Sequence, residues 1–173
     1  MEGLRHSLLA PAATTVLMIF GCANAMKTMV KVKYAAKDDN GKPLLPHPYE
    51  PWKAADVDEK HREQTDKAFR AFKMFENVKE WTFMTIPAMW VLAIFGGGLP
   101  YMTDNIMDAI TFGTGCINLL GVGMYTDGYI EAPKKRLRGF QIRKKVAEFW
   151  LYGSIVSVAW AALVKYGFVE GKQ

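Results

Sequence analysis

Residues 69–95 read FRAFKMFENVKEWTFMTIPAMWVLAIF, and this stretch decides the fold. Its first half is charged, its second half is apolar, and neither Gly nor Pro interrupts the junction. Such a run predicts a single helix that begins in water and continues into a bilayer. Pro87 lies deeper in the apolar half and is a candidate for a kink in that helix.

Polar side chains recur along the charged half of this helix at regular spacing. Successive offsets of three, four and three residues place them on one face, directly above the apolar span. A polar stripe at membrane depth is costly beside lipid and tolerable against a polar surface or a cavity. We call it the polar stripe and treat it as a candidate site. Its members are Arg70, Lys73, Asn77 and Glu80.

The chain as a whole is close to neutral in hydropathy, but its apolar residues are not evenly spread. Half of the 173 residues are hydrophobic and the mean hydropathy is −0.01. We predict an all-α fold, an integral membrane four-helix bundle with up-down-up-down topology, as a single domain over residues 1–173. A polar, proline-rich connection occupies about residues 35–56. The four spans are predicted at about residues 8–30, 66–98, 106–126 and 143–166.

Two segments admit two interpretations each. The sequence Ala23-Asn24-Ala25 follows an apolar run and matches the pattern of a cleavage site, so one interpretation of this run is a signal peptide. That run is long enough to span a membrane, so we interpret it as a retained first helix. In the proline-rich connection, three side chains either contact a partner or lie at headgroup level as interfacial residues. These are His47, Tyr49 and Trp52.

The net charge of +5 follows the predicted topology. Lys and Arg are concentrated in the connections between spans one and two and between spans three and four, whereas residues 96–108 contain none. Up-down topology places these two connections on one side, and the positive-inside rule makes that side cytosolic. No nucleic-acid motif accompanies the basic residues, so we expect no nucleic-acid partner.

Cys22 and Cys116 lie in apolar runs, so we assign neither a disulfide nor a metal site.

A second polar group lies at the same predicted end of the bundle. Tyr125 and Tyr129 are four residues apart on one helix face, and Arg136 is expected in the opening turn of the fourth helix. An antiparallel bundle brings this group level with the polar stripe, which predicts a polar pocket in a largely apolar wall. Such a pocket suits an anionic, peptide-like ligand whose thiol must ionise, because a nearby arginine favours the thiolate. The alternative is that these are interfacial side chains that reach the headgroups.

Two segments resemble the MAPEG family of membrane proteins, which act in eicosanoid and glutathione metabolism. The run from Arg70 to Trp81, with the spacing Arg-x-x-Lys-x-x-x-Asn-x-x-Glu-Trp, resembles the second-helix signature of that family. The run Tyr125-x-x-x-Tyr129-Ile-Glu-Ala-Pro-Lys-Lys-Arg136, followed by Arg138-Gly139, is similar to the signature between helices three and four. The likeness is strongest to the microsomal glutathione transferases and leukotriene C synthase.

This resemblance implies a homotrimer of four-helix subunits, with glutathione bound as a co-substrate between neighbouring subunits near the cytosolic face. It implies that Arg136 is the catalytic residue, which stabilises the glutathione thiolate. The chain departs from the family pattern at Lys73, Phe75, Trp81 and Val122, where the family usually has arginine, glutamine or histidine, tyrosine, and arginine, respectively. The residues implied to hold the tripeptide are Arg70, Lys73, Asn77, Glu80, Tyr125 and Tyr129.

The activity implied by the resemblance is that of a glutathione transferase or glutathione-dependent peroxidase acting on lipophilic substrates that enter from the bilayer. The alternative is a non-catalytic protein of the same fold, which presents a lipid to a partner or serves as an accessory subunit of a larger membrane complex. In either case we expect a lipid or lipophilic ligand. We expect the membrane to be that of the endoplasmic reticulum or another organelle, mitochondria and plastids included.

Overall fold

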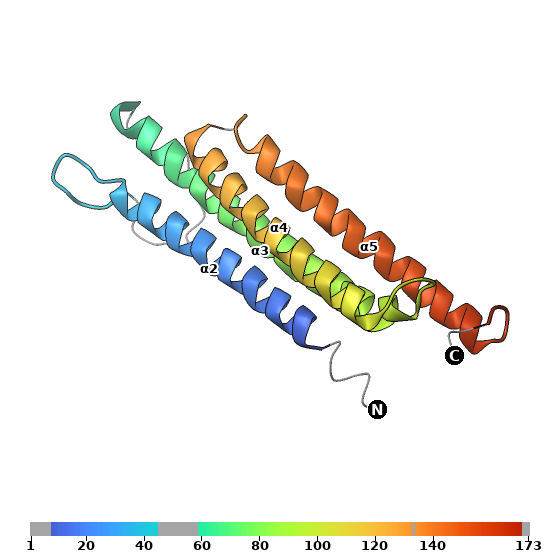
Figure 1. Cartoon of the computed structure of the whole chain (residues 1–173). Coiled ribbons are helices and arrows are strands. Elements are labelled where there is room, and N and C mark those ends of the chain that lie inside the picture. Colours follow the sequence, from blue (N-terminus) through green and yellow to red (C-terminus); the bar gives the residue numbers. More distant parts are fainter. Residues whose placement is uncertain (1–7, 45–58, 133, 171–173) are drawn as a thin grey trace.

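The computed structural model describes residues 8–44, 59–132 and 134–170. Within these residues, four long helices run side by side, and each is antiparallel to the next along the chain (Figure 1). The predicted all-α bundle with up-down-up-down topology is therefore confirmed. The helices are α2 (Leu9–Ala35), α3 (Arg62–Phe95), α4 (Asp104–Glu131) and α5 (Leu137–Lys165), with short 3₁₀ turns η2 (Glu59–His61) and η3 (Gly96–Gly98).

All four long helices of the described chain are long enough and apolar enough to cross a membrane. Even the shortest, α2, has 27 residues, or about 40 Å of helix against a hydrocarbon core of about 30 Å. Large apolar side chains such as Phe20 and Phe83 are exposed on the outside of the bundle, as contact with lipid requires. The chain is therefore an integral membrane protein. Each helix extends four to six residues beyond its predicted span at the end that carries a basic connection, and α5 begins at Leu137, six residues before the span predicted from residue 143.

Helix α3 is the continuous helix that residues 69–95 predict. It runs for 34 residues and continues through Pro87, which a membrane helix tolerates where other helices pack around it. It ends at Phe95, and the three glycines that follow form η3. Thr103 then caps α4, because its hydroxyl accepts a hydrogen bond from the Ile106 amide at 3.3 Å. This short connection turns the chain back into the bundle.

The interior holds two clusters of buried side chains. One lies toward the ends of the helices that carry the basic connections, and the other lies toward η3. Tryptophan side chains link helices in the second half of the bundle: the Trp150 indole nitrogen donates to the Thr114 hydroxyl at 3.0 Å, and that of Trp90 to Thr15 at 2.9 Å. The first cluster is Ala25, Met29, Ala71, Met74, Phe75, Val78, Val122, Tyr125 and Tyr129; the second is Met18, Met89, Leu92, Met107, Val146 and Trp150.

Glycine sets the closest approach between helices α4 and α5. A Cβ atom added at Gly139 would lie 2.7 Å from the Gly121 carbonyl oxygen and from the Tyr125 Cα, so only glycine fits there. The small residues of α4 predict close contact of this kind. The prediction covers Gly113, Gly115, Gly121 and Gly123. It is confirmed at Gly115, which packs against Thr14 of α2, and at Gly121, which packs against α5, whereas an added Cβ at Gly113 or Gly123 would meet nothing within 4 Å.

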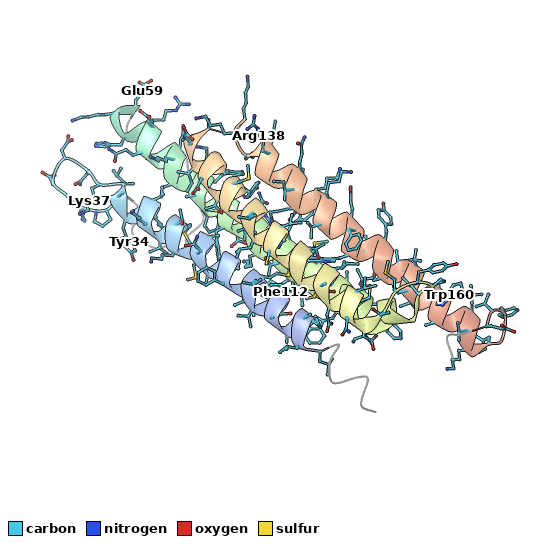
Figure 2. All side chains as sticks on the ribbon, viewed as in Figure 1. Tyr34, Lys37, Glu59, Phe112, Arg138 and Trp160 are labelled. Carbon is cyan, nitrogen blue, oxygen red and sulfur yellow. The ribbon has the colours of Figure 1, made fainter. Side chains whose placement is uncertain are left out.

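The basic connections lie at one end of the bundle. Lys37, Glu59 and Arg138, which mark the ends of α2, α3 and α5 on that side, lie together in Figure 2. The prediction that both basic connections share a side is thus confirmed, and we call this the basic end. The connection predicted at residues 35–56 starts with a bridge between Lys37 and Pro43. Its aromatic residues His47, Tyr49 and Trp52 lie outside the described residues, as does Pro133 between α4 and α5.

Candidate functional site

A cavity of about 250 Å³ lies between α3, α4 and the first turns of α5, near the basic end. Two arginines contribute to its wall, and no carboxylate does among the residues that the structure describes. We call it the arginine cavity. Its lining residues are Asn77 and Trp81 from α3, Tyr125 from α4, and Arg136, Leu137, Phe140 and Arg143 from the start of α5.

The polar wall of the arginine cavity is built from the two groups that the sequence predicts to meet. The Asn77 amide nitrogen on α3 donates a hydrogen bond to the Tyr125 phenol oxygen on α4 at 3.1 Å. Tyr125 is 4% exposed, and the close approach at Gly139 holds its backbone against α5. The phenol therefore has one defined position, with its hydroxyl directed to α3.

Arg136 lies at the end of this polar wall nearest the basic end. It is the N-cap residue of α5, one position before the opening turn in which the sequence predicts it. Its guanidinium carbon is 4.7 Å from the centre of the Tyr129 ring, a cation–π contact. The Tyr129 ring in turn packs edge-on against Tyr125, with centroids 5.4 Å apart. Asn77, Tyr125, Tyr129 and Arg136 thus form one continuous group.

The remaining members of the polar stripe do not line the cavity. Arg70 is half-buried, and its Nε has no hydrogen-bond partner among the described residues. Lys73 is exposed, with its ammonium nitrogen 5.7 Å from the centre of the Phe69 ring, and Glu80 is exposed as well. At about 100° per residue, Glu80 is rotated by roughly 60° from Asn77, and Arg70 is two turns, or about 10 Å, away along the helix.

Arg143 is a cavity residue that the sequence reasoning missed. It is 4% exposed, and its guanidinium carbon lies 5.5 Å from the Tyr125 ring centre and 5.9 Å from that of Trp81. The signal was present, because Arg143 follows Arg136 by seven residues, or two helical turns, and so shares its face. An arginine at the edge of an apolar span is itself a reason to expect a site.

The four departures from the pattern of the resembled family fall in three different places, and the first, Lys73, is exposed. Phe75 and Val122 are 7% and 4% exposed and belong to the buried cluster at the basic end, so they fill space inside the subunit. Trp81 lines the cavity, where its ring packs edge-on against Phe140 with centroids 5.7 Å apart. These two rings supply an apolar part of the cavity wall.

A larger depression of about 640 Å³ lies between α2, α3 and α4 at the basic end. Its charged lining residues are of both signs, Lys31 and Lys67 with Asp127 and Glu131. It contains none of the residues that the sequence predicts for a site. The arginine cavity is smaller, but its charge is of one sign, so we take it as the candidate site.

The arginine cavity offers guanidinium, amide and phenol groups and no acidic group, in a wall that is otherwise apolar. This chemistry favours an anion, because arginine forms charge-assisted hydrogen bonds with carboxylates and stabilises thiolates. Neither the models of known protein families nor the curated proteins contain a match to this chain.

Proposed function

We propose that this chain is a membrane-bound glutathione transferase or glutathione-dependent peroxidase of the MAPEG type. The observation that carries the proposal is the convergence of Asn77, Tyr125 and Arg136 on one cavity at the basic end. The same three residues belong to the two segments that resemble the family. The positive-inside rule assigns the basic end to the cytosolic side, where a water-soluble thiol has access to the cavity.

In the proposed reaction, glutathione loses its thiol proton to solvent and the thiolate is stabilised by Arg136. In the transferase reaction, sulfur forms a bond to a lipophilic electrophile, and the leaving group departs with the electron pair of its bond. In the peroxidase reaction, the thiolate attacks a lipid hydroperoxide and breaks its O–O bond, giving an alcohol and a glutathione sulfenate. A second glutathione, with one proton taken back from solvent, then reduces the sulfenate, giving glutathione disulfide and water.

The proposal includes a homotrimer with glutathione between neighbouring subunits. Lys73 and Glu80 support this part, because both are exposed on α3 rather than directed into the arginine cavity. Exposed charged side chains in this half of α3 are available to a ligand that lies between two copies. The size of the protein in mild detergent tests the trimer directly.

Activity of the purified protein tests the proposed function. We expect conjugation of glutathione to a chlorinated nitrobenzene, or reduction of a lipid hydroperoxide. Arg136→Ala should lower the rate by about 100-fold, since a lost electrostatic contact to a developing charge has this order of effect. Arg138→Ala is the matched control, because Arg138 is exposed two residues away and does not line the cavity. Equal rates in the two variants, or an inactive wild-type protein, would contradict the proposal.

A non-catalytic role is the second candidate, and the size of the cavity favours it. The volume of about 250 Å³ is below the range of roughly 300–1,000 Å³ that is usual for small-molecule sites. Phe75 and Val122 are buried and supply no polar group. An accessory or lipid-presenting protein would be recovered only within a heteromeric assembly and would bind no glutathione, whereas an enzyme would be recovered as a glutathione-binding trimer.

A further inference from the structure

Arg143 presents a buried charge that the protein itself does not neutralise. Arg143 is only 4% exposed. It forms no ion pair with any described residue, and none of the described Asp or Glu residues lines the cavity around it. Its Nε is buried and has no hydrogen-bond partner within the described chain. Removing a guanidinium from water in this way is costly unless an opposite charge compensates it.

The contacts that Arg143 does make are weak substitutes for a counter-ion. Its Nη2 donates to the Val78 carbonyl oxygen at 3.5 Å, the outer limit of a hydrogen bond. That oxygen already accepts a hydrogen bond from the Thr82 hydroxyl at 2.7 Å. The rings of Tyr125 and Trp81 offer cation–π contacts at 5.5 and 5.9 Å, which are near the limit of their range. The remaining hydrogen-bonding capacity of the guanidinium is therefore available to a ligand in the cavity.

We propose that Arg143 is an anion-binding residue of the arginine cavity, and that the ligand is a dianion with one acidic group at Arg136 and a second at Arg143. The two arginines share one face of α5 and are two turns, or about 10 Å, apart along the helix axis. Both guanidinium groups line one cavity in which no described carboxylate takes part, so two negative charges on the ligand complement them. Arginine suits the task because its planar fork pairs with a carboxylate through two hydrogen bonds.

This inference rests on the proposed function for the identity of the ligand. The thiolate form of glutathione carries the negative sulfur and two carboxylates, so it satisfies both arginines at once. In that arrangement Arg136 holds the thiolate, and Arg143 holds one of the carboxylates. Arg143 then determines which thiol compounds bind, since a thiol compound without a carboxylate leaves the buried guanidinium of Arg143 unpaired.

The test measures, by calorimetry in detergent, the affinity of each of three ligands for wild type and for two variants. The ligands are glutathione and two analogues that each lack one carboxylate, the glycine monoethyl ester and 4-aminobutyryl-cysteinylglycine. The variants are Arg143→Met, which keeps an unbranched apolar stem in place of the arginine methylenes and removes the guanidinium, and Arg138→Met as the exposed control. Wild type and R138M should bind one of the analogues about tenfold more weakly than glutathione, whereas R143M should bind that analogue and glutathione equally.

A second measurement separates ligand binding from packing. Without ligand, R143M should unfold at the same temperature as wild type or higher, because the substitution removes an unpaired buried charge. A lower melting temperature with unchanged discrimination among the three ligands would assign Arg143 to packing and overturn the inference.

The same measurements distinguish this inference from the proposed function. If R143M and wild type discriminate equally among the three thiols, the inference fails while glutathione binding stands. If wild type binds no glutathione but binds suberate, a thiol-free dicarboxylate, in a manner that R143M loses, the dianion site stands and the proposed function fails. If wild type binds neither, both are refuted.

Discussion

The close approach of α4 and α5 at Gly139 gives a sharp test of how the site is assembled. In Gly139→Ala the new methyl group would lie 2.7 Å from backbone atoms of Gly121 and Tyr125, and closer still to the Tyr125 amide nitrogen. Backbone atoms cannot rotate away, so the helices must separate by roughly 1 Å or more to bring the closest contact, with the Tyr125 amide nitrogen, to an ordinary distance. Overpacking of this kind costs about 1–3 kcal/mol. For a chain of this size, the apparent melting temperature should fall by about 2–10 °C.

Gly123→Ala is the matched control for this experiment, because the same methyl group there meets nothing within 4 Å. Alanine is the better helix former by about 1 kcal/mol, so G123A should be neutral or slightly more stable. Thermal unfolding in detergent compares the two variants. Glutathione binding should weaken in G139A alone, since the separation moves Tyr125 relative to Arg136. Equal melting temperatures for G139A and G123A would refute the close approach.

Three further substitutions test single contacts. Thr114→Val removes the acceptor of the buried Trp150 indole N–H and should cost about 1 kcal/mol, seen as a lower melting temperature; an unchanged value would contradict the hydrogen bond. Asn77→Leu removes the donor to the Tyr125 phenol and should weaken glutathione binding by about tenfold in calorimetry, and full affinity would exclude Asn77 from the site. Lys73→Ala should weaken glutathione binding several-fold if the ligand lies between subunits, whereas unchanged affinity would place it within one subunit.

The fold was predictable because the membrane makes the sequence signal strong. Four apolar runs and two basic connections are sufficient for a bundle of four spans, since every backbone polar group must be paired within a helix. The ends of the helices were less predictable. α5 starts at Leu137, next to the predicted position of Arg136 in its opening turn, and six residues before the span predicted from residue 143, because the basic residues of its first turns lie at the edge of the apolar region and still form helix.

The site was predictable only as far as helical periodicity reaches. Spacing assigned Asn77, Tyr125 and Arg136 to faces at one end of the bundle, and the structure brings these faces together. Spacing could not show that Glu80 is rotated out of the cavity, because residues three or four apart spread over a broad arc. It also could not show how deep Arg143 is buried. That depth depends on the close packing of α5 against Gly121, where an added Cβ would lie 2.9 Å from Arg143 Cγ.

The indole of Trp81 makes occupancy of the arginine cavity visible by fluorescence. Trp81 is half-buried and lines the cavity, whereas Trp90 and Trp150 have their indole N–H groups fixed to threonine hydroxyls between helices. A ligand that enters displaces water from the Trp81 ring and should shift its emission to shorter wavelengths, with little change from Trp90 and Trp150. The chain has two further tryptophans, Trp52 and Trp160, whose emission is present in both wild type and a variant that lacks Trp81. Subtracting the spectrum of a Trp81→Phe variant isolates this signal. Binding of a ligand that has no chromophore can therefore be followed by the fluorescence of Trp81.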